Sequence, residues 1–190
     1  MNIYQQIKEY KPINIQEEKD KMNILSFLDK YDDAFYRSNQ IAHMTASAWV
    51  TNPNKDKILM AYHRIYDSWS WLGGHCDGQE DCLKVALKEV EEEAGIKNVR
   101  PLSEDIFSLE ILTVDAHMRR GEYVPSHLHL NVTYLLEADD NEVVHIKEDE
   151  NSGVAWYPLD EAVRSSNEKW FRDNIYSKLN EKLRKRYENN

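Results

Sequence analysis

The spacing of apolar residues changes several times along the chain, and each change predicts a different kind of element. Apolar residues at helical spacing predict a short helix over residues 3–10 and a stronger one over residues 15–31. Residues 41–52 and 57–64 instead predict two strands, because a turn rich in Asn, Pro and Asp separates them. The apolar side of the second helix is formed by Met22, Ile24, Leu25, Phe27 and Leu28.

The second half of the chain alternates in the same way. A helical pattern runs from about residue 80 to residue 94, and residues 106–117 and 126–138 predict two strands joined by a loop. Residues 153–157 predict a further short strand, and residues 160–187 predict a closing helix. Strands with helices before, between and after them favour an α/β or α+β fold. The apolar stripe of the closing helix consists of Trp170, Phe171, Ile175, Leu179 and Leu183.

Composition limits the classes of protein to consider. The chain has 190 residues, of which 41% are hydrophobic, so one domain with a proper core is expected. The formal net charge of −10 does not suit binding to a nucleic-acid backbone, although divalent cations can still bring phosphates to an acidic protein. We therefore expect a small-molecule partner and no nucleic acid.

Location follows from what the sequence lacks. It contains no apolar run near the roughly 20 residues of a membrane span, and its start does not have the layout of a secretory signal. Cys76 and Cys82 do not suggest a disulfide framework. A cytoplasmic protein without a membrane partner is the expectation.

Three glutamates in the helix near residue 90 point to metal chemistry. At 100° per residue, Glu89, Glu92 and Glu93 gather on one flank of the apolar stripe, at the rim between core and solvent. Such carboxylates repel one another, and hard cations such as Mg²⁺ or Mn²⁺ relieve the repulsion. Lys88, at i,i+4 from Glu92, is placed to hold part of the array. The alternative is a solvated acidic face.

The spacing around these glutamates decides between the two interpretations. Residues 74–96 resemble the Nudix box, Gly-x5-Glu-x7-Arg-Glu-U-x-Glu-Glu-x-Gly-U with U aliphatic, and Lys88 in place of Arg is the single departure. The lead-in Trp69-Ser-Trp-Leu-Gly-Gly is similar to that of the family, with Leu72 in place of the common Pro. The resemblance covers roughly residues 41–162.

The resemblance implies a fold and a domain organisation. Nudix proteins have an α/β/α sandwich with a mixed β-sheet. Residues 36–190 would form that domain, with the box at 74–96 and an added C-terminal helix. Residues 1–35 would be an N-terminal helical extension, which packs either against the domain or against a second subunit in a homodimer.

The resemblance also implies an activity. Nudix enzymes use Mg²⁺ or Mn²⁺ to hydrolyse the diphosphate bond of a nucleoside diphosphate linked to another moiety, with a metal-activated water. Matching positions make Glu89, Glu92, Glu93 and the backbone carbonyl of Gly73 metal ligands. Glu92, Glu93 and Glu150 are the predicted catalytic residues, and Glu92 and Glu150 are the two candidates for general base. Glu80, Lys88 and Gly95 are structural positions of the box.

A second set of residues is predicted to bind substrate. Arg64 and Arg119 can pair with phosphates, and Gly74 allows a close backbone approach. His127 and His129 lie two apart on a predicted strand, so they share one face. With His75 they can bind phosphate or a transition metal, and the alternative for all three is an ordinary buried histidine.

Two other functions fit the same fold. Isopentenyl-diphosphate isomerases use a Cys and a Glu, but Cys76 follows Gly-Gly-His here instead of preceding Gly-His. A non-catalytic module that binds a nucleotide sugar is the other alternative. Such modules typically lack the glutamates that this chain retains.

Overall fold

The computed structural model describes residues 1–119 and 121–187 of the chain. The chain divides into two compact units, and each is described by itself. Unit 1 consists of Met1–Ser47, Gly73–Ala86 and Glu104–Tyr134. Unit 2 consists of Ala48–Leu72, Leu87–Ser103 and the chain from Leu135 onward.

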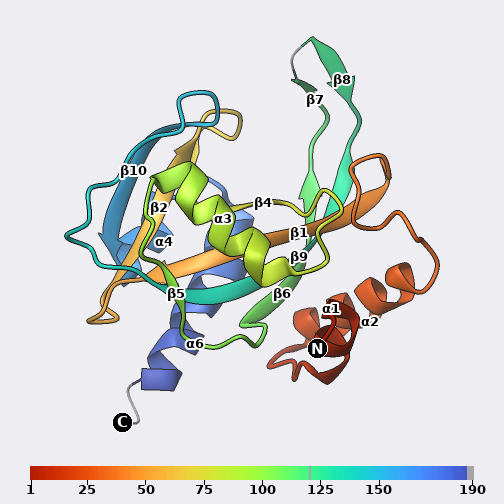
Figure 1. Cartoon of the computed structure of the whole chain (residues 1–190), viewed down its shortest axis with the longest axis horizontal. Coiled ribbons are helices and arrows are strands. Elements are labelled where there is room, and N and C mark those ends of the chain that lie inside the picture. The colour runs from red at the N-terminus through yellow and green to blue at the C-terminus, as the bar shows by residue number, and fades with distance from the viewer. Residues whose placement is uncertain (120, 188–190) are drawn as a thin grey trace. The chain divides into compact units, whose positions relative to one another are not determined.

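The strands form a mixed sheet, which confirms the predicted fold class (Figure 1). Its strand order is β10-β2-β1-β9-β5, with β3 on β2, β4 on β1 and β6 on β9. β9 runs parallel to β1, because Leu128 N–H donates to Ile41 O and Ala138 N–H donates to Thr51 O. The other registered pairs are antiparallel. The strands are β1 (Ala42–Thr51), β2 (Lys57–His63), β3 (Ser68–Ser70), β4 (Leu72–His75), β5 (Arg100–Pro101), β6 (Ser108–Val114), β9 (His127–Glu137) and β10 (Asn151–Pro158).

The helical segments follow the predictions except at the C-terminal end. A single helix over residues 160–187 is wrong, because the backbone turns extended at Ser166, with φ −73° and ψ 133°. Trp170 is 48% exposed, so it does not belong to the buried stripe. None of the described helices is long and apolar enough to cross a membrane. The helices are α1 (Ile3–Glu9), α2 (Ile15–Leu28), α3 (Cys82–Ala94), α4 (Leu159–Ser165), α5 (Lys169–Phe171), the π-helix η1 (Arg172–Tyr176) and α6 (Ser177–Tyr187).

A short hairpin stands where a loop was predicted between β6 and β9. Its strands β7 (His117–Arg119) and β8 (Glu122–Val124) pair antiparallel and project from unit 1 (Figure 1). Gly121, at φ +85°, supplies the backbone conformation that such a tight connection needs. Arg120 and the side chain of Arg119 lie outside the described residues.

The N-terminal helices belong to unit 1. Ile7 and Ile24 are fully buried, and α2 packs on β6. Met22, which was predicted to be on the apolar side of α2, is 57% exposed, so that prediction is wrong. Side chains of α2 also pair with the backbone of β6: Gln16 Nε2–H donates to Leu109 O at 3.3 Å, and Asp20 Oδ2 accepts from Ile111 N–H at 3.0 Å. The extension is thus attached to a strand of the sheet.

Glu17 is the main polar link in this attachment. Its carboxylate is fully buried and accepts hydrogen bonds from Tyr10 Oη at 2.7 Å, Ser108 Oγ at 2.9 Å and Ile13 N at 3.0 Å. This one side chain therefore links three segments. They are helix α2, the residues that follow α1, and strand β6. A buried charge at such a position is tolerated because several donors surround it.

We expect the substitution Glu17→Ala to destabilise the protein by about 2 kcal/mol, because it leaves the buried donors of Tyr10 and Ser108 without this acceptor. Urea denaturation monitored by circular dichroism measures the effect. Glu18→Ala is the matched control, since Glu18 is the exposed neighbour on the same helix. Equal stability of the two variants would contradict the prediction.

Candidate active site

The helix α3 carries the acidic residues, and its sequence explains both where it lies and where it ends. Cys82, Val85, Ala86, Val90 and Ala94 are buried and form its core-facing side. The helix ends at a glycine, Gly95, with φ +72°. A Cβ atom at this position would lie 2.9 Å from the His145 ring, so the glycine also allows the following loop to pack closely. The structural role predicted for Gly95 agrees with this geometry.

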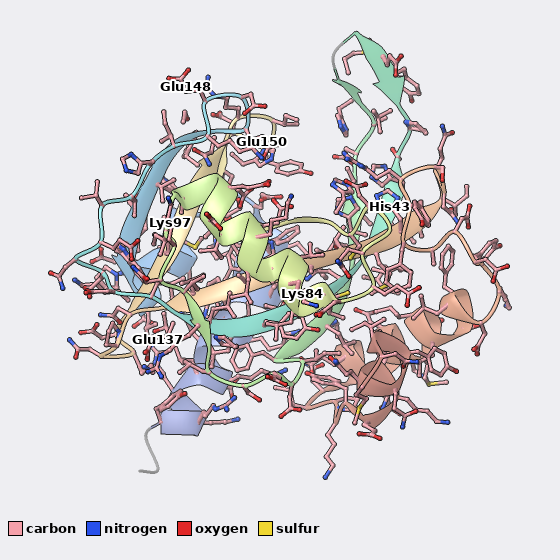
Figure 2. All side chains as sticks on the ribbon, viewed as in Figure 1. His43, Lys84, Lys97, Glu137, Glu148 and Glu150 are labelled. Atoms are coloured by element: carbon pink, nitrogen blue, oxygen red, sulfur yellow. The ribbon has the colours of Figure 1, made fainter. Side chains whose placement is uncertain are left out.

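Three carboxylates converge in unit 2. One oxygen from each of Glu89, Glu93 and Glu150 lies within 4.8 Å of one oxygen of the other two. Glu89 and Glu93 belong to α3. Glu150, labelled in Figure 2, comes from the loop before β10. Glu93 is only 6% exposed, and the other two are half-buried. Residues 57 positions apart in the sequence thus meet in one small volume.

A buried amide holds the loop of Glu150 against the helix. Asn151, 2% exposed, donates from Nδ2 to the Glu93 carbonyl at 2.9 Å, and its Oδ1 accepts from Lys147 N–H at 3.1 Å. The Arg64 N–H donates to the Glu150 carbonyl at 3.2 Å. Sequence reasoning missed Asn151, since an isolated Asn at a strand start carries no pattern. The hydrogen bonds of Asn151 position the loop of Glu150 beside α3.

Glu92 has different partners from the other two glutamates of the helix. Its carboxylate pairs with Lys88 Nζ at 2.8 Å and with Lys147 Nζ at 3.4 Å. The hydrogen bond from Lys88 is the main reason why the pKa of Glu92 lies below its usual value. The structure thus contains the Lys88–Glu92 ion pair, while the role of Lys88 in the box stays a prediction. Lys147, which also pairs with Glu150 at 2.9 Å, was not anticipated.

The electrostatics of the cluster favour a bound cation. Burial is the main cause that raises the pKa of Glu89, and the charges of Glu92 and Glu150 add to it against the opposing effect of Lys88 and Lys147. Three close carboxylates without a cation would repel one another. Their oxygen atoms are the donors that Mg²⁺ and Mn²⁺ prefer, so the residues present fit such an ion.

The remaining predicted site residues are not members of the carboxylate trio. Gly73 and Gly74 belong to β4 in unit 1, and Glu80 is exposed just before α3. Arg64 is exposed at the end of β2, next to the backbone of Glu150. The roles predicted for Gly73, Gly74, Glu80, Arg64 and Arg119 stay predictions.

The predicted histidines meet in unit 1 together with a fourth that the sequence reasoning missed. One ring nitrogen from each of His43, His75, His127 and His129 lies within 4.8 Å of one from every other. Burial, followed by the charges of His75 and His43, lowers the pKa of His129 to about 2. His43 went unnoticed because it stands alone in β1, and only strand pairing brings it to the others.

The chain was compared with protein families and with curated protein sequences. The family model described as NUDIX domain matches residues 42–179. No curated protein sequence matches the chain.

Solved structures share the fold at low sequence identity. A Caenorhabditis elegans Ap4A hydrolase binary complex matches with a TM-score of 0.54 and 19% identity, covering 77% of this chain and 98% of that one. The Escherichia coli dihydroneopterin triphosphate pyrophosphohydrolase matches with a TM-score of 0.53 and 13% identity, covering 77% and 96%. The NUDIX domain of Shewanella oneidensis NrtR complexed with ADP ribose matches with a TM-score of 0.52 and 16% identity, covering 85% and 96%.

Proposed function

Because the chain belongs to the NUDIX domain family and is a hydrolase of that family, we propose that it cleaves the diphosphate bond of a nucleoside diphosphate linked to another moiety, with Mg²⁺ or Mn²⁺ as cofactor. The observation that carries this proposal is the convergence of Glu89, Glu93 and Glu150 within 4.8 Å. Two of these residues belong to the box, and the third arrives from a distant loop. This arrangement supplies the oxygen donors that the chemistry needs.

Glu89 and Glu93 are the proposed metal ligands. They lie four residues apart, so they stand one above the other on α3. Glu89 and Glu93 would hold a divalent cation, which would supply charge to neutralise the diphosphate and would lower the pKa of a bound water. Gly73 was also predicted as a ligand through its carbonyl, and that role stays a prediction.

Glu150 is the better placed of the two general-base candidates. One oxygen of its carboxylate lies within 4.8 Å of an oxygen of Glu89 and of Glu93. Among the described residues it pairs with Lys147 alone, whereas Glu92 is outside this trio and pairs with both Lys88 and Lys147. Glu150 would accept the proton of the attacking water, and Asn151 keeps its loop in position. Lys147, between Glu92 and Glu150, would then restrain both carboxylates.

The pair of cysteines argues against the isomerase alternative. Cys76 is 3% exposed and its Sγ lies 3.7 Å from Sγ of Cys82, so it is not open to a substrate. The intact carboxylate trio argues against a non-catalytic module.

Both cysteines are free thiols, and this supports a reducing, cytoplasmic compartment. We propose a small-molecule substrate and no nucleic-acid partner, while a homodimer stays a prediction.

A substrate panel tests the activity. The similar structures suggest Ap4A and ADP-ribose as first members, together with a nucleotide sugar, a nucleoside triphosphate and isopentenyl diphosphate. With Mg²⁺ or Mn²⁺ we expect the release of nucleoside monophosphate or phosphate from at least one compound, and we expect none with a chelator in excess. Hydrolysis in ¹⁸O-labelled water identifies the phosphorus that is attacked.

The other outcomes distinguish the alternatives. Double-bond migration in isopentenyl diphosphate without release of phosphate would favour the isomerase. Thermal stabilisation by a nucleotide sugar without any turnover would favour the binding module. Release that continues in the chelator would contradict the metal-dependent mechanism.

A further inference from the structure

We propose that His43, His75, His127 and His129 form a second metal site, one for a divalent transition metal such as Zn²⁺. Four imidazoles meet at this place from three paired strands of unit 1: His43 at the start of β1, His75 at the end of β4, and His127 and His129 on β9. Figure 2 shows His43 among the side chains at that end of the sheet. Imidazole nitrogen suits Zn²⁺, whereas the carboxylates of Glu89 and Glu93 suit harder cations.

The spacing of the rings matches a tetrahedral site. The Nε2 atoms of His127 and His129 lie 3.2 Å apart and share a hydrogen bond, which a bound ion would replace. Two nitrogen ligands at about 2.05 Å from a tetrahedral zinc ion lie about 3.3 Å apart. The ring centroids of His43 lie 5.0 to 5.1 Å from those of the other three, and those of His75 and His129 are 4.8 Å apart. Because one ring nitrogen of each histidine lies within 4.8 Å of one from every other, the four are close enough to approach one ion.

Two of the rings are held in the tautomer that binds a metal. Nδ1–H of His43 donates to the Asn39 carbonyl at 3.0 Å, and Nδ1–H of His127 donates to the Pro125 carbonyl at 2.8 Å. A carbonyl oxygen only accepts, so these nitrogens carry the protons and each Nε2 presents a lone pair. A backbone carbonyl on the second nitrogen is the usual support of a metal-bound histidine.

The Nε2 atom of His43 is the second, independent observation. His43 is 3% exposed, and among the described residues its Nε2 has no hydrogen-bond partner. A buried acceptor without a donor is costly, and a bound metal would satisfy it. The ring of His43 lies 5.0 to 5.1 Å from the rings of the other three histidines, so the unsatisfied atom belongs to the ring that neighbours all of them.

These tautomers also decide between metal and phosphate. A phosphate requires N–H donors or positive charge directed at it. The N–H groups of His43 and His127 instead point away to carbonyls, and their lone pairs would repel an anion. Protonating several rings at these distances is opposed by their mutual repulsion. The cluster therefore fits a cation.

Metal uptake by the purified full-length chain tests the proposal. The chain is stripped with a chelator, dialysed with Mg²⁺ in large excess to occupy the carboxylates, and then equilibrated with Zn²⁺ or Co²⁺. We expect about one Zn²⁺ per chain by mass spectrometry of the metal, and the intense visible absorption of tetrahedral Co²⁺. His129→Gln and His75→Gln should each lower the affinity at least tenfold.

His117→Gln is the matched control. His117 lies on the neighbouring hairpin with its Nδ1 bonded to the Asp115 carbonyl, and it is not a member of the cluster. It should bind Zn²⁺ as the unchanged chain does. If the His129→Gln variant does not fold, two measurements still test whether the cluster binds a metal. One is zinc uptake by His75→Gln, because His75 is only half-buried, and the other is the Co²⁺ spectrum of the unchanged chain. No uptake, equal uptake by all variants, an octahedral Co²⁺ spectrum, or stabilisation by inorganic phosphate without zinc uptake would each overturn the proposal.

Discussion

Replacing Glu93 with glutamine is expected to lower kcat of the metal-dependent hydrolysis by about a thousandfold, or about 4 kcal/mol of transition-state stabilisation. The glutamine keeps the size of the side chain but removes the charge of the most buried member of the carboxylate trio. Because the neutral side chain would no longer repel the carboxylates of Glu89 and Glu150, the fold should survive. Steady-state kinetics over a range of Mg²⁺ concentrations measures the loss.

Glu91→Gln is the control for this variant. Glu91 belongs to the same helix and lies two residues away, but it is exposed and outside the trio. It should retain nearly full activity, and circular dichroism should show that both variants fold. Full activity in Glu93→Gln would contradict the assignment of the site, and equal losses in both variants would indicate a general effect of lowering the charge of α3.

Replacing Gly73 with alanine is expected to destabilise the protein by about 3 kcal/mol, which corresponds to a fall of roughly 10 °C in Tm. A Cβ atom at this position would lie 2.6 Å from the Ala46 carbonyl oxygen, 2.6 Å from Ser47 Oγ and 2.7 Å from Ser47 Cα. Two of these atoms are backbone atoms of the paired strand β1, so no side-chain rotation relieves the clash. Thermal unfolding followed by circular dichroism measures the shift.

Gly153→Ala provides the comparison. Its Cβ would lie 3.1 Å from Cη2 of Trp69, which is the edge of a side chain and not backbone. We expect a loss of less than about 1 kcal/mol, because the ring can shift slightly. A Gly73→Ala protein as stable as Gly153→Ala would show that β4 can move away from β1, and would remove the physical basis of this prediction.

Local patterns were good guides where the elements are regular. The box helix was predicted over residues 80–94 and is observed over Cys82–Ala94, since a continuous apolar stripe at helical spacing has few alternatives. The closing helix was less predictable. Its pattern continued across residues 160–187, but the extended backbone at Ser166 interrupts it. Ser166 Oγ lies 3.2 Å from Ser68 Oγ of β3, a tertiary contact that no local pattern encodes.

The sequence by itself determined which residue types the box helix offers, because the spacing of Glu89, Glu92 and Glu93 along one helix is a local property of the chain. Only the tertiary structure decided which carboxylates lie together. It brings Glu150 to Glu89 and Glu93 and leaves Glu92 paired with two lysines. It also brings His43 to the other histidines. The histidine cluster depends on strand pairing, and the carboxylate trio depends on the packing of a loop against a helix. Both bring together residues that are far apart in the chain, so the local sequence pattern does not show these contacts.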